Sequence, residues 1–292
     1  MKRKLFNILY PYLFLLPAFI ILFVVLAYPW LNSFYLSFHS YRPGVSEEIN
    51  FVGLENYYSI FKDKLFGIST YNTIFLLIGE ISIQFILGLL IALSLNSIKS
   101  FRRFFRTVAL LPLVLAPALS SLAWRFLVDP VRGFINGFLL MLGIKGPDWI
   151  GDPNYALLTI LVIEVWKFTP YVTLILLAGL QGIPPPLLEA AAIDGATRWQ
   201  SFRYITFPWL KPFIAIALLF RTMFVLRTFE IIYLLMGLGG PGNSAMVYGT
   251  YLVYLTRKLW DLGLGSAMSI ILVVITGIIS IGYFMFLYKG GD

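Results

Sequence analysis

Charged side chains occur inside long apolar stretches of this chain, where charges are rare and usually have a function. A charge near the middle of a lipid bilayer costs at least about 2.5 to 3.5 kcal/mol on insertion scales, so such a side chain usually faces protein or water. Glu164 and Lys167 are three residues apart, which places them on one face of a helix where they could form an ion pair. Arg227 and Glu230 have the same spacing. The whole set is Glu80, Arg125, Glu164, Lys167, Arg221, Arg227 and Glu230.

Two interpretations of these charges remain open. In the first, they line a polar path for a solute, and nearby aromatic side chains stack on the faces of sugar rings. In the second, they pair between helices or extend to the ends of the membrane spans. Arg125 and Arg227 are weaker candidates because they lie near predicted span boundaries, whereas Glu80 and Glu164 are stronger ones. The predicted path residues are Glu80, Glu164, Trp166, Lys167, Tyr171 and Glu230.

The composition indicates an integral membrane protein. Of the 292 residues, 59% are hydrophobic and 12% are charged, and the mean hydropathy is +0.85, whereas a soluble domain has about a quarter charged residues. Long apolar stretches recur along the whole chain, which predicts one membrane domain over residues 1–292. The net charge of +8 comes from short basic clusters between apolar runs, so we do not expect nucleic-acid binding.

Few side chains are available for catalysis or metal binding. Cysteine is absent, which excludes a disulfide framework, a thiol nucleophile and a cysteine zinc site. The single histidine, His39, has no companion for a metal or catalytic site. No Ser/His/Asp arrangement or carboxylate pair for glycoside hydrolysis can be built from the residues outside the apolar stretches. We therefore expect neither an enzyme nor a metal or cofactor held by this chain.

Six stretches are long and apolar enough to cross a membrane as helices. A span needs about 20 apolar residues, and a helix satisfies its backbone hydrogen bonds internally. The first stretch superficially resembles a signal peptide, but it is longer than the roughly 7 to 15 apolar residues of such a signal. We predict an all-α membrane fold of about six spans at residues 12–38, 71–96, 105–127, 155–181, 205–236 and 266–288.

Basic residues orient these spans because Lys and Arg are retained on the cytoplasmic side of a membrane. The N-terminus, the second and fourth connections and the C-terminal tail contain 11 basic and three acidic residues. The other three connections contain seven basic and eight acidic residues. Both termini are therefore predicted to lie in the cytoplasm.

Prolines interrupt several of the spans, and their role has two interpretations. They could make simple kinks between packed helices, or they could make breaks that line a solute path. The prolines concerned are Pro17, Pro29, Pro112, Pro117 and Pro170.

The fourth connection, residues 183–208, has the signals of a short helical hairpin. Pro186 can occupy a first helical turn, and the alanines at 190–192 favour helix. Gly195 stands where a left-handed residue would end this helix. At about nine residues, or roughly 14 Å, the helix is too short to span a membrane.

A second helix is predicted to follow directly. Thr197 and Gln200 have the spacing of a capping box, and Pro208 would stop or kink the helix that they begin. The first helix, with its run of alanines, can let another protein approach closely. The alternative is a helix that lies among lipid headgroups.

The same connection resembles the EAA loop of the permease subunits of binding-protein-dependent ABC importers. The pattern is long and internally spaced, which makes it specific. Phe207 departs from it, because the family usually has Leu before the final proline. The matching residues are Glu189, Ala190, Ala191, Asp194, Gly195, Ala196, Phe202, Ile205, Pro208 and Pro212.

Other stretches resemble the carbohydrate-uptake branch of this family, specifically its maltose- and glycerol-phosphate-type first permeases. They are residues 109–112, 178–184, and 229–233 followed by 239–242. Asp is commoner than Glu in that branch at the position of Glu230, so we expect any polar role of this residue to be adjusted here.

The resemblance implies a fold, a mechanism and a set of partners. In this family the EAA loop forms a coupling helix that docks in a cleft of a separate ATPase subunit and transmits its closure to the pore. This chain has no phosphate-binding GxxxxGK[ST] sequence, so ATP and Mg would be bound by that ATPase. The implied coupling residues are Glu189, Ala190, Ala191, Asp194 and Gly195.

The implied partners are a second, similar permease, two ATPase subunits, an external substrate-binding protein and the bilayer of a bacterial or archaeal inner membrane. The implied function is import of a sugar or oligosaccharide-like solute by alternating access. The main alternative is a proton-coupled secondary transporter, which the intramembrane Glu80, Glu164 and Lys167 would suit.

Overall fold

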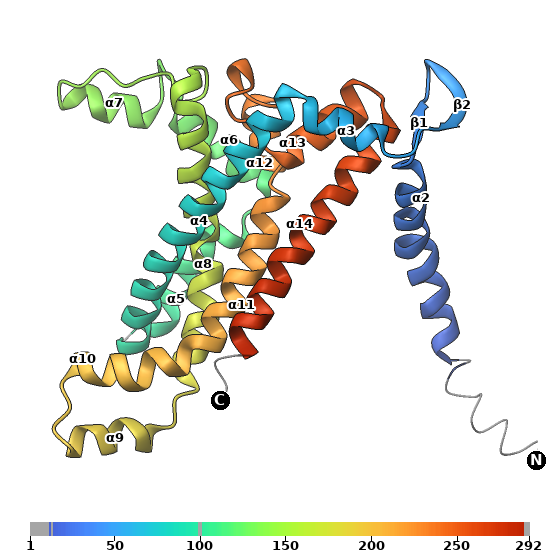
Figure 1. The fold of residues 1–292 in the computed structure, drawn as a ribbon. Coiled ribbons are helices and arrows are strands. Elements are labelled where there is room, and N and C mark those ends of the chain that lie inside the picture. Colours follow the sequence, from blue (N-terminus) through green and yellow to red (C-terminus); the bar gives the residue numbers. More distant parts are fainter. Residues whose placement is uncertain (1–11, 13, 99–100, 289–292) are drawn as a thin grey trace, which may run out of the picture. The chain divides into compact units, whose positions relative to one another are not determined.

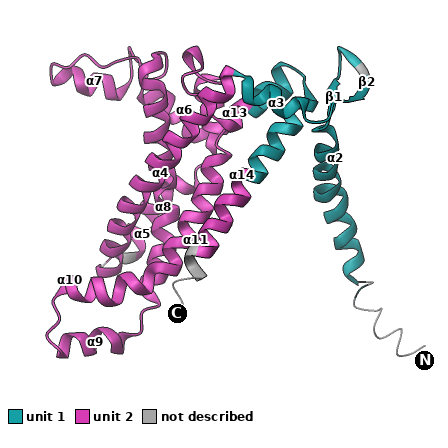
Figure 2. Cartoon of the chain, viewed as in Figure 1, with its two compact units in different colours: residues 1–63, 252–274 teal, residues 64–251, 275–292 magenta. Residues whose placement is uncertain are grey.

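The computed structural model describes residues 12, 14–98 and 101–288, most of them in helices (Figure 1). Contacts divide the chain into two compact units, residues 1–63 with 252–274 and residues 64–251 with 275–292 (Figure 2). The single membrane domain expected for residues 1–292 stays a prediction. The predicted cytoplasmic location of the termini concerns residues 1–11 and 289–292, which lie outside the described residues.

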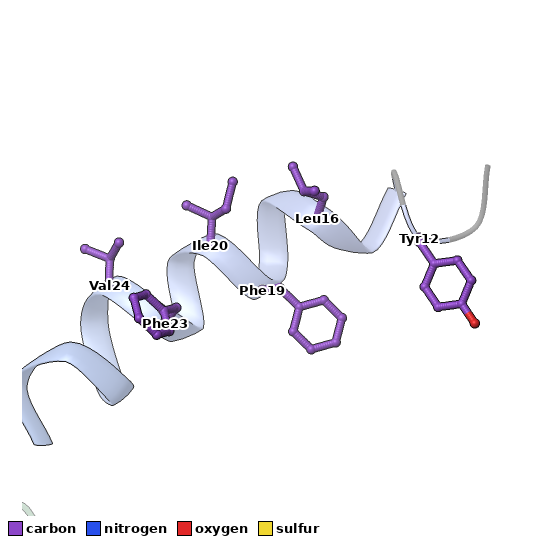
Figure 3. Close-up of a pocket in the computed structure, with 6 residues that line it drawn as sticks. All are labelled: Tyr12, Leu16, Phe19, Ile20, Phe23 and Val24. Carbon is purple, nitrogen blue, oxygen red and sulfur yellow. The ribbon is translucent and has the colours of Figure 1, made fainter. Parts of the chain in front are cut away.

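The first unit contains a long apolar helix that its own unit leaves exposed. This helix covers Phe14–Leu36, includes a π-helical turn at Phe23–Ala27 and ends with α2 (Tyr28–Leu36). Figure 3 shows five of its apolar side chains at helical spacing, Leu16, Phe19, Ile20, Phe23 and Val24, together with Tyr12, which precedes this range. A helix that is apolar and uncovered in this way suits a membrane environment, as predicted for residues 12–38.

The rest of the first unit is a small β-hairpin with short helices. Strands β1 and β2 pair antiparallel, and Asn56 fixes the entry to the hairpin by donating from Nδ2 to Ser37 O and His39 O, both at 2.9 Å. Arg42 forms an ion pair with Asp261. This hairpin is a local addition to the predicted helical fold. The elements are β1 (His39–Arg42), β2 (Ser46–Phe51), α3 (Glu55–Lys62), a π-helical turn (Tyr254–Lys258) and the first half of α14 (Leu262–Tyr288).

Three long helices form the core of the second unit. Helix α4 (Lys64–Ser97) packs along α8 (Pro153–Gln181), and α11 (Phe207–Leu226) packs against both. A Cβ atom on Gly88 would lie 2.9 Å from Val172 Cγ1, so glycine is what lets α4 approach α8 so closely. The other elements are α5 (Arg102–Val114), α6 (Pro117–Leu127), α7 (Phe134–Met141), α9 (Pro185–Ile193), α10 (Arg198–Ser201), a π-helical turn (Phe202–Thr206), α12 (Glu230–Met236), a 3-10 turn (Pro241–Asn243) and α13 (Tyr248–Val253).

The number of membrane-spanning helices agrees with the sequence. Within the described residues, five helices are long and apolar enough to span, and α5 with α6 makes a sixth, broken span bent by 94°. The prediction of an all-α membrane protein with about six spans is confirmed. The predicted fifth span, 205–236, was wrong at its C-terminal end, since α11 ends at Leu226 and α12 begins anew at Glu230. The break contains Arg227 and Thr228 and is followed by Glu230, but the long apolar stretches on both sides of it suggested one continuous span.

A π-helical turn carries the chain past Pro208. A proline inside a helix lacks an N–H group, and its ring clashes with the carbonyl four residues before it. The π-helical turn Phe202–Thr206 ends two residues before Pro208, and there Phe207 donates its N–H to the carbonyl five residues back. The turn before Pro29 has the same geometry. The helix therefore continues over Arg198–Leu226, so of the two predicted effects of Pro208, a stop or a kink, the stop does not occur.

Candidate functional site

A cavity of about 250 Å³ lies among α6, α8, α11 and the start of α12 in the second unit. Side chains of both charge signs share its wall, together with aromatic rings. Its charged and aromatic residues include Glu164, Lys167, Phe168, Arg221, Arg227 and Glu230.

Arg221 lies in the wall of this cavity and is bonded to two side chains of α4. Its Nη2 donates to Glu80 Oε2 at 2.7 Å and its Nε donates to Gln84 Oε1 at 2.8 Å. The side chains of Arg221 and Glu80 are 1% and 0% exposed. Gln84 in turn donates to the backbone oxygen of Glu164 at 3.0 Å, and the guanidinium carbon of Arg221 lies 4.3 Å from the centroid of the Phe168 ring. The network fixes the guanidinium beside the cavity.

Lys167 stabilises the break between α5 and α6. Its Nζ donates to the backbone oxygen of Leu115 at 2.6 Å and to Ser120 Oγ at 3.0 Å. Leu115 has an extended backbone (ψ 130°), which turns its carbonyl out of the helix and leaves it in need of a donor. The ammonium group supplies that donor, so α8 holds the two halves of the broken span together.

The structure pairs the intramembrane charges differently from the sequence-based expectation. Within the described part of the chain, no ion pair within 4.0 Å joins Glu164 to Lys167 or Arg227 to Glu230. Lys167 reaches the helix break instead, and Glu164 contributes its carboxylate to the cavity wall. The ion pairs that this spacing would allow are therefore not formed. A carbonyl freed at a distant break was the better partner for Lys167.

The predicted path residues are only partly brought together. Glu164, Lys167 and Glu230 line the cavity, and Glu80 lies behind it as the partner of Arg221. Tyr171 packs at the edge of the cavity, because its ring makes a T-shaped contact with the cavity residue Phe224 at 5.8 Å. Trp166 lies elsewhere, against Trp124 at 5.7 Å and beside a separate apolar groove.

Sequence reasoning did not select Arg221 or Gln84 for the site. Arg221 was visible as an intramembrane charge, but its partners are 137 and 141 residues away along the chain. Gln84 follows Glu80 by four residues, so both side chains share one face of α4. That spacing was the signal available for Gln84.

The prolines within the broken and long spans have two kinds of surroundings. Pro117 lines the polar cavity. Pro112 and Pro170 line an apolar groove of about 530 Å³ between α4, α5 and α8. The prolines had two interpretations, simple kinks between packed helices or breaks that line a solute path. The position of Pro117 fits the second.

The hairpin of α9 and α10 lies at the end of the second unit opposite to α7 (Figure 1). Helix α9 ends in a Schellman motif, in which Ala196 N–H bonds to Ala191 O at 2.9 Å and Gly195 N–H bonds to Ala192 O at 3.2 Å. Gly195 has a left-handed backbone (φ 74°), which a residue without a Cβ adopts at no steric cost. The predicted nine-residue helix and its glycine end are confirmed.

The second half of the hairpin begins with the predicted capping box. Thr197 N–H donates to Gln200 Oε1 at 2.7 Å, and Gln200 N–H donates to Thr197 Oγ1 at 3.3 Å. The hairpin also exposes large apolar side chains, with Ile193 86% exposed and Trp199 65% exposed. A structured hairpin with uncovered apolar groups is typical of a protein-binding surface.

Comparison with known protein families gives a match over most of the chain. Residues 84–289 match the family described as binding-protein-dependent transport system inner membrane component. This range includes the hairpin of α9 and α10, Gln84 and every cavity residue named above.

Two curated relatives are similar along most of their lengths. The trehalose/maltose transport system permease protein of Thermococcus litoralis is 38% identical over 264 residues, which are 90% of this chain and 88% of the relative. The sulfoquinovosyl glycerol transport system permease protein of Agrobacterium fabrum is 36% identical over 264 residues, 90% of this chain and 85% of the relative.

A solved structure has the same fold. The chain matches a subunit in the crystal structure of a bacterial ABC transporter involved in the import of the acidic polysaccharide alginate, with a TM-score of 0.87 and 24% identity over 100% of this chain and 99% of that one. A second structure, the alginate transporter in complex with an alginate pentasaccharide-bound periplasmic protein, matches with a TM-score of 0.82 and 24% identity over 96% of this chain and 94% of that one. At this identity the likeness establishes the fold of an ABC importer permease.

Proposed function

Because the chain belongs to the family of binding-protein-dependent transport system inner membrane components, we propose that it is the permease subunit of an ATP-driven importer for a sugar or oligosaccharide-like solute. The observation that carries this proposal is the family match over residues 84–289, a range that includes both the polar cavity and the exposed hairpin. The names of the two curated relatives, both of which refer to carbohydrate compounds, support the class of solute.

We assign the coupling function to the hairpin of α9 and α10. Its Schellman motif and capping box hold the two helices in a fixed relation, so a push on α9 is passed to α10. Helix α10 continues through the π-helical turn into α11, which carries Arg221 at the cavity. This continuous helix gives a mechanical connection between the hairpin and the cavity. The proposed coupling residues are Glu189, Ala190, Ala191, Asp194 and Gly195.

The polar cavity is the proposed part of the solute path. Its wall offers the guanidinium and ammonium groups of Arg221 and Lys167 as donors and the carboxylate of Glu164 as an acceptor. Phe168 and Phe224 add aromatic faces, against which sugar rings stack. Donors and acceptors of both charge signs suit a neutral polyhydroxylated solute better than a single ion.

The remaining parts of the importer are proposed from the family. They are a second, similar permease subunit, two ATPase subunits that bind ATP and Mg²⁺, and an extracytoplasmic substrate-binding protein. The transporter would lie in a bacterial or archaeal inner membrane, with both termini of this chain in the cytoplasm. ATPase closure would move α9 and shift the bundle between inward-facing and outward-facing states, a two-state change biased by differential binding.

Uptake by the complete transporter in proteoliposomes tests the proposal against a proton-coupled secondary transporter. We expect uptake of a radiolabelled maltodextrin or related sugar to require ATP on the side of α9 and to persist when a protonophore removes the proton gradient. Uptake without ATP that collapses with the proton gradient would refute the proposal and support the secondary transporter, for which Glu164 would be the leading proton carrier.

A further inference from the structure

Helix α7 (Phe134–Met141) is a short helix that runs across the direction of the membrane spans. Along the chain it follows α6 and precedes α8, and it projects sideways from the end of the unit where α8 begins (Figure 1). Its eight residues make it about 12 Å long, which is far too short to cross a bilayer. It belongs neither to the polar cavity nor to the hairpin of α9 and α10.

One face of α7 is held rigidly by the segment that returns beneath it. Asn136 Nδ2 donates to Pro130 O and Pro147 O, both at 3.1 Å, and Asn136 Oδ1 accepts from Trp149 Nε1 at 2.6 Å. A Cβ on Gly146 would lie 2.1 Å from Asn136 Oδ1, so a larger residue there would push Asn136 out of these bonds. These contacts fix which way the opposite face of the helix points.

The opposite face is an apolar stripe. Phe134, Phe138 and Met141 are spaced i, i+4 and i+7, which places them on one side of the helix. They are 72%, 54% and 86% exposed. Residues 133–144 contain no charged side chain, and an exposed cation flanks them at each end, Arg132 and Lys145.

We propose that α7 is an interfacial helix whose Phe134, Phe138 and Met141 stripe is buried in the headgroup and acyl boundary of the bilayer, at the interface opposite to the α9 and α10 hairpin. A short helix with an uncharged apolar face and flanking cations has the chemistry of a membrane-surface helix. The apolar face inserts, while Arg132 and Lys145 reach lipid phosphates.

The surroundings of α7 place it at the depth of that interface. The segment leaves a membrane span at Leu127 and enters another at Pro153, so its two ends are tied to the membrane surface. Trp149 and Tyr155 pack in a T-shaped contact at 5.8 Å where α8 begins. Trp and Tyr are enriched at this level of a bilayer, where one end of the side chain is apolar and the other is wet.

A docking site for the extracytoplasmic binding protein is the other use for an exposed helix on this side. Such a protein must leave in each cycle, and transient interfaces are about as polar as ordinary protein surface. The uncharged stripe of α7 has no acidic or hydroxyl groups for such a contact. The bilayer is therefore the occupant that the residues favour.

Spin labels on the complete transporter in lipid nanodiscs test this proposal. The chain has no cysteine, so Met141→Cys and Phe138→Cys each introduce a single labelling site once the cysteines of the other subunits are replaced. The control is Val45→Cys, an equally apolar and 79% exposed position in the turn of the β-hairpin. Collision rates with oxygen, which dissolves in lipid, and with a water-soluble nickel chelate are then compared.

The ratio of oxygen to nickel-chelate collisions is expected to be several-fold higher at both α7 positions than at Val45. A ratio at Met141 and Phe138 equal to that at Val45 would overturn the proposal. Protection from the nickel chelate that appears only when the binding protein is added would also overturn it, and would identify α7 as a docking surface for that protein. All three substitutions replace exposed side chains, so the fold is expected to tolerate them.

Discussion

Replacing Arg221 by Met should destabilise the protein strongly, and the structure sets the size of the effect. Arg221 and Glu80 are 1% and 0% exposed and lie 2.7 Å apart. Removing one partner of a buried ion pair costs about 3 to 5 kcal/mol, because the other charge stays buried without compensation. Here the substitution leaves the Glu80 carboxylate in that position and also removes the donor from Gln84 Oε1.

The double variant Glu80→Met with Arg221→Met should recover most of this loss. Replacing both charges by apolar side chains of similar volume is often neutral. What remains is the cost of leaving Gln84 Oε1 without its donor, about 1 to 3 kcal/mol. The single variant is thus expected to be less stable than the double variant, although it changes fewer residues.

The free energy of unfolding would be measured by titrating SDS into detergent micelles that contain the purified permease. Arg42→Gln is the matched control. Arg42 is also paired, with Asp261, but its side chain is 52% exposed. After the substitution Asp261 still accepts a hydrogen bond from the N–H of Leu264. Only Asp261 of this pair is buried, so loss of the pair should cost less than the loss of the fully buried Arg221 and Glu80 pair. If Arg221→Met costs no more than Arg42→Gln, the idea that the buried network stabilises the core is refuted.

Three further substitutions test separate parts of the account. Gly195→Val forces a β-branched residue into the left-handed conformation (φ 74°), which should disturb the turn between α9 and α10. ATP hydrolysis should then continue while uptake in proteoliposomes falls. Normal coupling of hydrolysis to uptake would contradict the proposed role of the hairpin. Lys167→Met removes the donor to Leu115 O and should lower the free energy of unfolding by about 1 to 3 kcal/mol, whereas an unchanged SDS midpoint would show that the break needs no donor. In Gly88→Val the new Cβ would lie 2.9 Å from Val172 Cγ1, and this overpacking should lower the free energy of unfolding by about 1 to 3 kcal/mol. The control is Gly137→Val at an exposed position, where a Cβ meets nothing within 4 Å; it should cost less in the same SDS titration.

The parts of the structure that depend on local signals were predictable from the sequence. Each signal of the α9 and α10 hairpin involves residues at most five positions apart, such as Thr197 with Gln200 or Gly195 after the alanines. Such signals act through the backbone of a single turn, so no knowledge of distant neighbours is needed. The number of spans was predictable for the same reason, since hydropathy is a property of each stretch by itself.

The pairing of the intramembrane charges could not be predicted in this way. Arg221 bonds to a carboxylate 141 residues away, and Lys167 bonds to a carbonyl 52 residues away at a helix break. Spacing along one helix suggested different partners, because it carries no information on which helix packs alongside. The break at residues 227–229 was missed for another reason: its polar residues, Arg227 and Thr228, lie between two apolar stretches that together have the hydropathy of one long span.

The central claim is that the α9 and α10 hairpin is the surface through which a separate ATPase moves this permease. Cysteine cross-linking tests it most directly. Ile193→Cys is 86% exposed in the wild-type geometry and would be cross-linked, in the complete transporter in nanodiscs, to cysteines placed along the cleft of the ATPase subunit. We expect a cross-link whose yield changes between the nucleotide-free and ATP-bound states. Lipid accessibility at Ile193 with no cross-link in either state would show that the ATPase does not contact the hairpin.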